Sequence, residues 1–171
     1  MHSACGRSSA DHRDRMRRLS AFILVLFLGA CSSSITNEHL WPSVSVADAT
    51  GSIVQTSNFI PEDVLVVSLW STWCVPCRRE LPQLQQYALE HPEVSIVAVN
   101  LGDKPESVAQ FAKEIGLNMP ILIDSEGRIS SSLGVTSVPA TLIIDSKGVV
   151  IATHVGEISS TDLATLVETS N

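Results

Sequence analysis

The stretch LWSTWCVPCRRELPQL (residues 69–84) places Cys74 and Cys77 directly after an apolar run and directly before a helical pattern. Residues three apart on one helical turn lie close enough to form a disulfide, and the free N–H groups of a first turn favour a thiolate at Cys74. A disulfide across so small a loop constrains the unfolded chain little, because its stabilising effect grows with loop length. The pair is therefore predicted to exchange thiols and disulfides with other proteins.

The exchange needs both cysteines. A thiolate at Cys74 can attack a partner's disulfide to give a mixed disulfide, and Cys77 can then attack Cys74 and release the reduced partner. The reverse sequence oxidises a partner. Pro76 has no N–H and fixes φ at an early helical position, which would keep the two sulfurs in register.

The first 30 residues are predicted to be a lipoprotein signal peptide. Arg17 and Arg18 precede the apolar run LSAFILVLFLGA (residues 19–30), which is shorter than the ~20 residues that span a bilayer. LGAC (residues 28–31) resembles the lipobox of bacterial lipoproteins, and this resemblance implies that Cys31 carries lipid. A plain secretory signal is the alternative, and Met16 could be the true start.

The remaining 141 residues suit one domain with a single core. Residues 1–30 hold five of the 11 basic and two of the 18 acidic side chains, which leaves six against sixteen, a net charge of −10. This charge, with no basic cluster, argues against nucleic-acid binding. Residues 31–43 are predicted to be a tether and residues 44–171 the folded domain.

Apolar runs alternate with helical patterns from residue 44 onward, which predicts an α/β sandwich. Asp103 and Glu106 have the spacing of a capping box, and Pro82 falls inside a helix. The predicted elements are a hairpin around residues 49–52, strands at 64–70, 94–100 and 121–124, helices at 75–90, 103–116 and 128–133, a hairpin of 140–145 with 149–155, and a final helix capped by Ser159 or Ser160.

The motif WCVPC (residues 73–77) resembles the WCxPC centre of thioredoxin-like proteins. Trp70, Pro82 and Val138-Pro139 fall where that fold places a tryptophan, a helix kink and a cis-proline. Cys31, the N-terminal hairpin and the extra helix at 103–116 make the chain similar to the exported or lipid-anchored branch represented by TlpA and ResA. The resemblance covers residues 44–167 and implies a mixed central sheet flanked by helices.

The resemblance implies roles for the cysteines and their neighbours. Cys74 would be the exposed nucleophile and Cys77 the buried resolving thiol, with Val75 and Pro76 between them. Trp73 would flank the rim of the site.

The resemblance also assigns residues farther along the chain. Pro139 would be a cis-proline beside the disulfide, and Val138 would offer its backbone to an extended peptide. Glu80 matches an acidic residue that influences thiol ionisation and client choice in the ResA-like branch. The alternative is that Glu80 is an exposed helix residue paired with Arg78 or Arg79.

Two positions depart from the family pattern. The buried acid of thioredoxin falls on Ser68, so proton transfer would involve Glu80 or water, or would be slower. The sequence after Pro139 is Ala140-Thr141, without the glutamate of specialised cytochrome c maturation reductants, which weakens apocytochrome c as the client. The pair between the cysteines contains no histidine, so the chain is expected to be a reductase.

Other functions stay open on the sequence alone. A copper(I)-handling protein, a thioredoxin-like binding protein without turnover, and a disulfide oxidase or isomerase are the alternatives. Zinc binding would need His39, His91 or His154, none of which has ligand-like spacing to the cysteines. No resident metal is expected, and no cofactor beyond a redox-active Cys74–Cys77 disulfide.

The expected location and partners follow from the signal and the family. We expect lipid anchoring at the extracytoplasmic face of a bacterial membrane, and Ser32 after the lipidated cysteine would permit outer-membrane transport in Gram-negative enterics. The expected partners are client protein thiols and disulfides and a membrane thiol-reducing donor of unknown identity.

Overall fold

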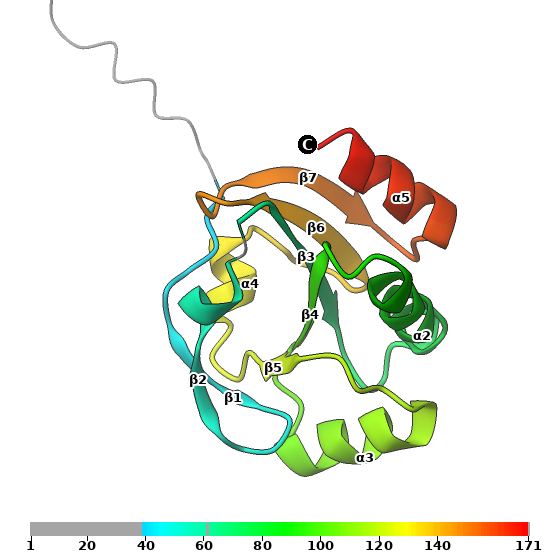
Figure 1. The fold of residues 1–171 in the computed structure, drawn as a ribbon. Helices are drawn as coiled ribbons and strands as arrows, with labels where there is room; N and C mark the ends of the chain where they lie inside the picture. The colour runs from blue at the N-terminus through cyan, green and yellow to red at the C-terminus, as the bar shows by residue number, and fades with distance from the viewer. Residues whose placement is uncertain (1–38, 61, 171) are drawn as a thin grey trace, which may run out of the picture. The chain divides into compact units, whose positions relative to one another are not determined.

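A mixed sheet of seven strands forms the centre of the fold (Figure 1). The computed structural model describes residues 39–60 and 62–170, so the predicted signal peptide, Cys31 and Ser32 lie outside the described part. The strands are β1 (Ser45–Asp48), β2 (Ile53–Gln55), β3 (Val64–Trp70), β4 (Ser95–Asn100), β5 (Ile121–Ile123), β6 (Ala140–Asp145) and β7 (Val150–Val155). The helices are the 3-10 helix η1 (Thr56–Phe59) and the α-helices α2 (Val75–Glu90), α3 (Pro105–Ile115), α4 (Arg128–Ser132) and α5 (Ser160–Glu168).

The strand order is β2-β1-β5-β4-β3-β6-β7. Strands β3, β4 and β5 run parallel, and every other pairing is antiparallel. All seven residues of β3 are buried, because helices cover both faces of the central strands. The predicted mixed α/β sandwich is confirmed, with the N-terminal hairpin and with α3 as the extra helix between β4 and β5.

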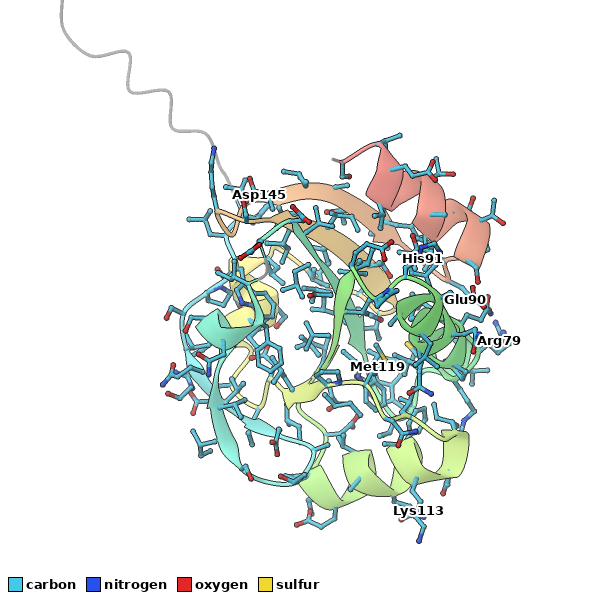
Figure 2. The ribbon with its side chains drawn as sticks, viewed as in Figure 1. Arg79, Glu90, His91, Lys113, Met119 and Asp145 are labelled. Atoms are coloured by element: carbon cyan, nitrogen blue, oxygen red, sulfur yellow. A yellow bond between two sulfur atoms is a disulfide. The ribbon has the colours of Figure 1, made fainter. Side chains whose placement is uncertain are left out.

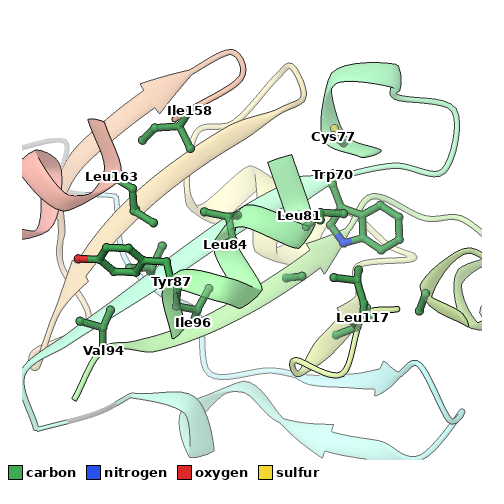
Figure 3. Packing of buried hydrophobic residues seen from close by; sticks show 14 of the residues in the cluster. Trp70, Cys77, Leu81, Leu84, Tyr87, Val94, Ile96, Leu117, Ile158 and Leu163 are labelled. Carbon is green, nitrogen blue, oxygen red and sulfur yellow. The ribbon is translucent and has the colours of Figure 1, made fainter. Parts of the chain in front are cut away.

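Helices α2, α3 and α5 cover one face of the sheet, and α4 and η1 lie on the other (Figure 1). The first face packs a cluster that includes Trp70, Leu81, Leu84 and both cysteines (Figure 3). The ring of Trp70 lies 4.8 Å from that of Phe111, measured between centroids. The cysteine pair therefore belongs to the larger core and not to a surface loop.

Most predicted boundaries agree with the structure to within one or two residues. Gly148 has φ +83° in the turn between β6 and β7, as expected for the second hairpin. Ser159 is the N-cap of α5, and its hydroxyl accepts a hydrogen bond from the N–H of Asp162 at 3.1 Å.

The predicted capping box at Asp103 and Glu106 is wrong. Helix α3 begins at Pro105 with Lys104 as its N-cap, and no side chain caps it. The carboxylate of Asp103 instead accepts hydrogen bonds from the Thr72 N–H at 2.7 Å and from the Asn100 amide at 2.8 Å. The carboxylate is therefore bonded to the β3–α2 loop and to the last residue of β4 instead of capping α3.

The folded part begins before residue 44, earlier than predicted. Trp41 is only 5% exposed, and its indole N–H donates to the carbonyl of Thr56 at 2.9 Å. Its backbone N–H donates to the carbonyl of Gly148 at 2.8 Å. The burial of one large aromatic side chain thus draws the end of the predicted tether into the domain. No helix in residues 39–60 and 62–170 has the length and apolar character needed to cross a membrane.

Candidate redox site

The two cysteines form a disulfide at the junction of β3 and α2. Their Cα atoms are 5.3 Å apart, and Cys74 is the N-cap of α2. The N–H of Cys77 donates to the sulfur of Cys74 at 3.2 Å. The first turn of the helix therefore directs a backbone donor at the Cys74 sulfur, as the sequence predicts, and this contact favours a negative charge there after reduction.

Cys74 is not exposed in this disulfide form, contrary to the prediction. It is 3% exposed and Cys77 is 1% exposed, because the bond draws the Cys74 sulfur toward a partner that lies in the core. The neighbours on each side of Cys74 are exposed: Trp73 by 71% and Val75 by 67%. Two exposed apolar side chains thus flank a covered disulfide.

A hydrogen-bonded network holds the loop that leads into Trp73. Besides the two bonds to Asp103 described above, the Asn100 side-chain oxygen accepts from the N–H of Asp103 at 2.9 Å. Asn100 is fully buried, although it is polar. The sequence analysis did not predict this network. The available signal was a polar residue at the end of a buried strand, Asn100, followed by Gly102 and Asp103.

The Val138-Pro139 peptide bond is cis, as the resemblance implies. Val138 is half-buried and packs against the core cluster that contains the cysteines. The carbonyl of Pro139 accepts from the N–H of Gly156 at 2.9 Å. Within the part of the chain that the structure describes, neither the N–H nor the carbonyl of Val138 has a hydrogen-bond partner. A backbone edge is therefore free for another chain.

Glu80 is fully buried, so the alternative of an exposed, ion-paired residue is wrong. One carboxyl oxygen accepts from the hydroxyls of Ser68 and Thr141, each at 3.3 Å. The other oxygen accepts from the N–H of Ile158 at 3.1 Å. The helix turns this side chain inward, toward β3 and β6.

The two arginines before Glu80 find other partners. Arg78 lies 3.5 Å from the carboxylate of Glu114, and its guanidinium lies 4.6 Å from the centre of the Phe111 ring. Arg79, on the outer surface of α2 (Figure 2), pairs with Glu157, with its Nε 3.0 Å from one carboxylate oxygen. Both arginines are therefore engaged without Glu80.

Burial raises the pKa of Glu80, and the hydrogen bonds from Ile158, Ser68 and Thr141 oppose that rise. Glu80 follows Cys77 by three positions, so the two side chains share one face of α2. The carboxyl accepts a hydrogen bond from Ser68, the position to which the resemblance assigns the buried acid of thioredoxin.

The three histidines considered for zinc lie in separate places. His39 contacts the carbonyl of Ser132 at 3.2 Å, and the ring of His91 stacks on that of Tyr87 at 4.2 Å. His154 lies 3.3 Å from the carbonyl of Glu157. In residues 39–60 and 62–170, no group of three or more histidine, cysteine or acidic side chains is arranged to hold a metal ion.

Comparison with known proteins finds the same kind of protein by sequence and by structure. Residues 38–153 match the AhpC/TSA family. The chain is 32% identical over 124 residues to the thiol-disulfide oxidoreductase ResA of Geobacillus thermodenitrificans, covering 71% of each chain.

Two solved structures are similar in fold. StoA from Bacillus subtilis is 27% identical with a TM-score of 0.62, over 73% of this chain and 98% of that one. A putative thiol:disulfide interchange protein DsbE from Chlorobium tepidum is 25% identical with a TM-score of 0.68, over 78% of this chain and 96% of that one.

Proposed function

Because this chain belongs to the AhpC/TSA family and is a thiol-disulfide oxidoreductase, we propose that it mainly reduces disulfides in client proteins outside the cytoplasm. The observation that carries the proposal is the Cys74 sulfur at the start of α2, which accepts a backbone hydrogen bond from Cys77. A thiolate held there is the attacking group, and Cys77 resolves the mixed disulfide.

The direction of electron flow depends on how strongly the reduced state is favoured. The two residues between the cysteines, Val75 and Pro76, bring no imidazole to the thiolate. Within the described residues, the Cys74 sulfur accepts one hydrogen bond, from the backbone N–H of Cys77. The reduced state is therefore favoured less than in strongly oxidising enzymes, and the dithiol gives up its electrons more readily.

Clients would bind as extended peptides at the cis-proline. The free backbone groups of Val138 can pair with a client strand, and apolar client side chains can pack on Trp73 and Val75. A client disulfide docked there would lie against the cysteine pair.

Glu80 would exchange the proton that Cys77 gains or loses. Its pKa is raised by burial, which makes the ionised carboxyl a better base than an exposed glutamate. The hydroxyls of Ser68 and Thr141 hold the carboxyl in place. This arrangement supplies the acid that Ser68 cannot.

The cellular setting rests on the N-terminus. A lipid on Cys31 would tether the domain to the extracytoplasmic face of a bacterial membrane, and Ser32 would permit an outer-membrane location. A membrane thiol-reducing donor would then return the disulfide to the dithiol.

The test combines two variants with a redox titration. Insulin reduction should be lost in Cys74→Ser, whereas Cys77→Ala should trap mixed disulfides with clients. Titration against a thiol buffer should give a potential more reducing than about −200 mV. Activity that survives in Cys74→Ser would refute the mechanism, and a potential near about −120 mV would reverse the direction.

A further inference from the structure

The connection between β7 and α5 contacts three parts of the redox site. In this segment, residues 156–158, the Gly156 N–H donates to the carbonyl of Pro139 at 2.9 Å. The Glu157 carboxylate pairs with Arg79, and the Ile158 N–H donates to Glu80 at 3.1 Å. One short segment therefore joins the cis-proline, the outer surface of α2 and the buried acid.

The contacts to α2 come from adjacent residues that point in opposite directions. Arg79 points outward, with a side chain 58% exposed, and Glu80 points inward and is fully buried. Glu157 meets the first and Ile158 meets the second. The 156–158 segment thus contacts both the outward and the inward side chain of α2 and bonds directly to the buried Glu80 carboxyl.

The local backbone and side chains hold this crossing. Gly156 has φ +105°, a conformation that residues with a Cβ rarely adopt. Ile158 is 1% exposed and packs in the core cluster (Figure 3). Glu157 is the one polar side chain of the segment, and it pairs with Arg79. This ion pair therefore holds the exposed side of the segment to α2.

The Glu80 carboxyl is bonded to Ser68 of β3 and Thr141 of β6. On α2, Cys77 lies three positions before Glu80 on the same face of the helix, and Arg79 points outward. The 156–158 segment adds the Ile158 N–H and the negative charge of Glu157, whose carbonyl is contacted by His154 of β7.

We propose that Glu157, held by Arg79, is a positioning residue that keeps the 156–158 segment closed over Glu80 and thereby controls the reactivity of the cysteine pair. The proposal rests on the proposed function, in which Glu80 exchanges a proton with Cys77. It assigns a regulatory contact to an ion pair on the protein surface.

The expected direction follows from solvation. When the ion pair is lost, the segment opens more often and water reaches the Glu80 carboxyl, which favours its ionised form. Loss of the Glu157 charge acts in the same direction, since that charge raises the pKa of Glu80. A carboxylate beside Cys77 disfavours a second negative charge, so fewer thiolates form at a given pH.

The test uses Glu157→Gln, which removes the charge and keeps the size of the side chain. Glu114→Gln is the matched control, because it removes the carboxylate paired with the neighbouring Arg78 without touching the segment. The double variant Arg79→Glu with Glu157→Arg reverses the pair and tests for rescue.

Three measurements report on the site. The Glu80 carboxyl is titrated by carbon NMR in the disulfide form, and amide hydrogen exchange is followed at Ile158. The alkylation rate of Cys74 in the reduced protein is measured against pH. The titration and the pH profile would not change if the ion pair only supported the fold.

We expect Glu157→Gln to lower the midpoint of the Glu80 titration and to accelerate exchange at Ile158. Alkylation of Cys74 should slow by about twofold to fivefold below neutral pH, the range for an exposed ion pair. The Glu114→Gln protein should behave like wild type. The reversed pair should restore slow exchange at Ile158 but not the Glu80 titration, because position 157 then carries a positive charge that lowers the pKa of Glu80.

A wild-type titration and alkylation profile in Glu157→Gln would overturn the proposal, as would equal changes in Glu114→Gln. Failure of the proposed function would instead appear in the wild-type protein, as absent client reduction or an oxidising potential. The two failures are therefore distinguishable.

Discussion

Replacement of Glu80 by alanine should cost a large share of the stability of the domain. The Ile158 N–H would lose a bond to a carboxylate, worth about 1.5–3 kcal/mol, and the Ser68 and Thr141 hydroxyls would each lose a longer bond worth about 0.5–1.5 kcal/mol. Together these losses amount to about 2.5–6 kcal/mol, against a typical total of about 5–15 kcal/mol.

Glu80→Gln separates the hydrogen bonds from the charge. The amide oxygen can accept from the Ile158 N–H, and the amide nitrogen can donate to the Ser68 and Thr141 hydroxyls, which are able to accept. All three hydrogen bonds can therefore still form, with donor and acceptor exchanged in the bonds to Ser68 and Thr141. We expect Glu80→Gln to fold with a free energy of unfolding within about 1 kcal/mol of wild type at neutral pH.

The pH dependence of stability separates these variants further. Because burial raises the pKa of Glu80 in the folded protein above its ordinary value of 4.5, the folded state holds this proton more tightly than the unfolded state. Its contribution to stability is therefore fully present below pH 4.5 and is lost as the pH rises through the folded pKa. Glu80→Gln should lack this decline.

The assay is urea unfolding of the disulfide form, measured at about pH 4 and about pH 8. The free energy of unfolding of wild type, relative to that of Glu80→Gln, should be larger at the acidic pH than at the alkaline pH. Equal loss of stability in the glutamine and alanine variants would refute the hydrogen-bond account. An identical pH dependence in wild type and Glu80→Gln would refute the raised pKa.

Three further substitutions test other parts of the structure. Asp103→Ala should cost about 1–3 kcal/mol and slow insulin reduction, because the Thr72 N–H loses its acceptor; unchanged turnover would contradict a role in holding the active-site loop. Trp41→Ala should cost about 3–5 kcal/mol in urea unfolding if the residues before 44 belong to the fold, and a neutral effect would place them in the tether. Ser159→Ala should cost about 1 kcal/mol through the lost cap of α5, and a cost below a few tenths would show that water replaces it.

The sequence predicts the strands and helices well because their signals are local. The buried run of β3 and the alternation around Gly148 each reflect packing or turn chemistry within a few residues. The cysteine pair and the helix that follows it were likewise predicted from residues close together in the sequence. The position of the disulfide in the fold was therefore predictable without any knowledge of distant contacts.

The failures at Glu80 and Asp103 involve side chains whose partners are distant in sequence, whereas Cys74 is covered through its bond to Cys77, three positions away. Glu80 bonds to residues 12, 61 and 78 positions away, so helical periodicity alone left its burial undecided. Asp103 bonds to Thr72, 31 positions away, and this contact outweighed the local capping pattern. A carboxylate goes to the donors that the folded chain brings to it, which spacing in one helix cannot reveal.

In the proposed mechanism the start of α2 favours the Cys74 thiolate and Glu80 accepts the Cys77 proton, and this division suits a two-step exchange. The first turn of α2 favours a thiolate at Cys74, which must be charged before it meets a client. Cys77 must instead lose its proton only after the mixed disulfide has formed. An ordinary thiol has a pKa of about 8.5, and the raised pKa of Glu80 makes the difference between the two pKa values smaller. Transfer of the Cys77 proton to Glu80 therefore costs less free energy than transfer to an exposed glutamate. An acid that burial keeps weak is therefore better suited to the proposed second step than a fully solvated one, and it lies three positions after Cys77 on the same face of α2.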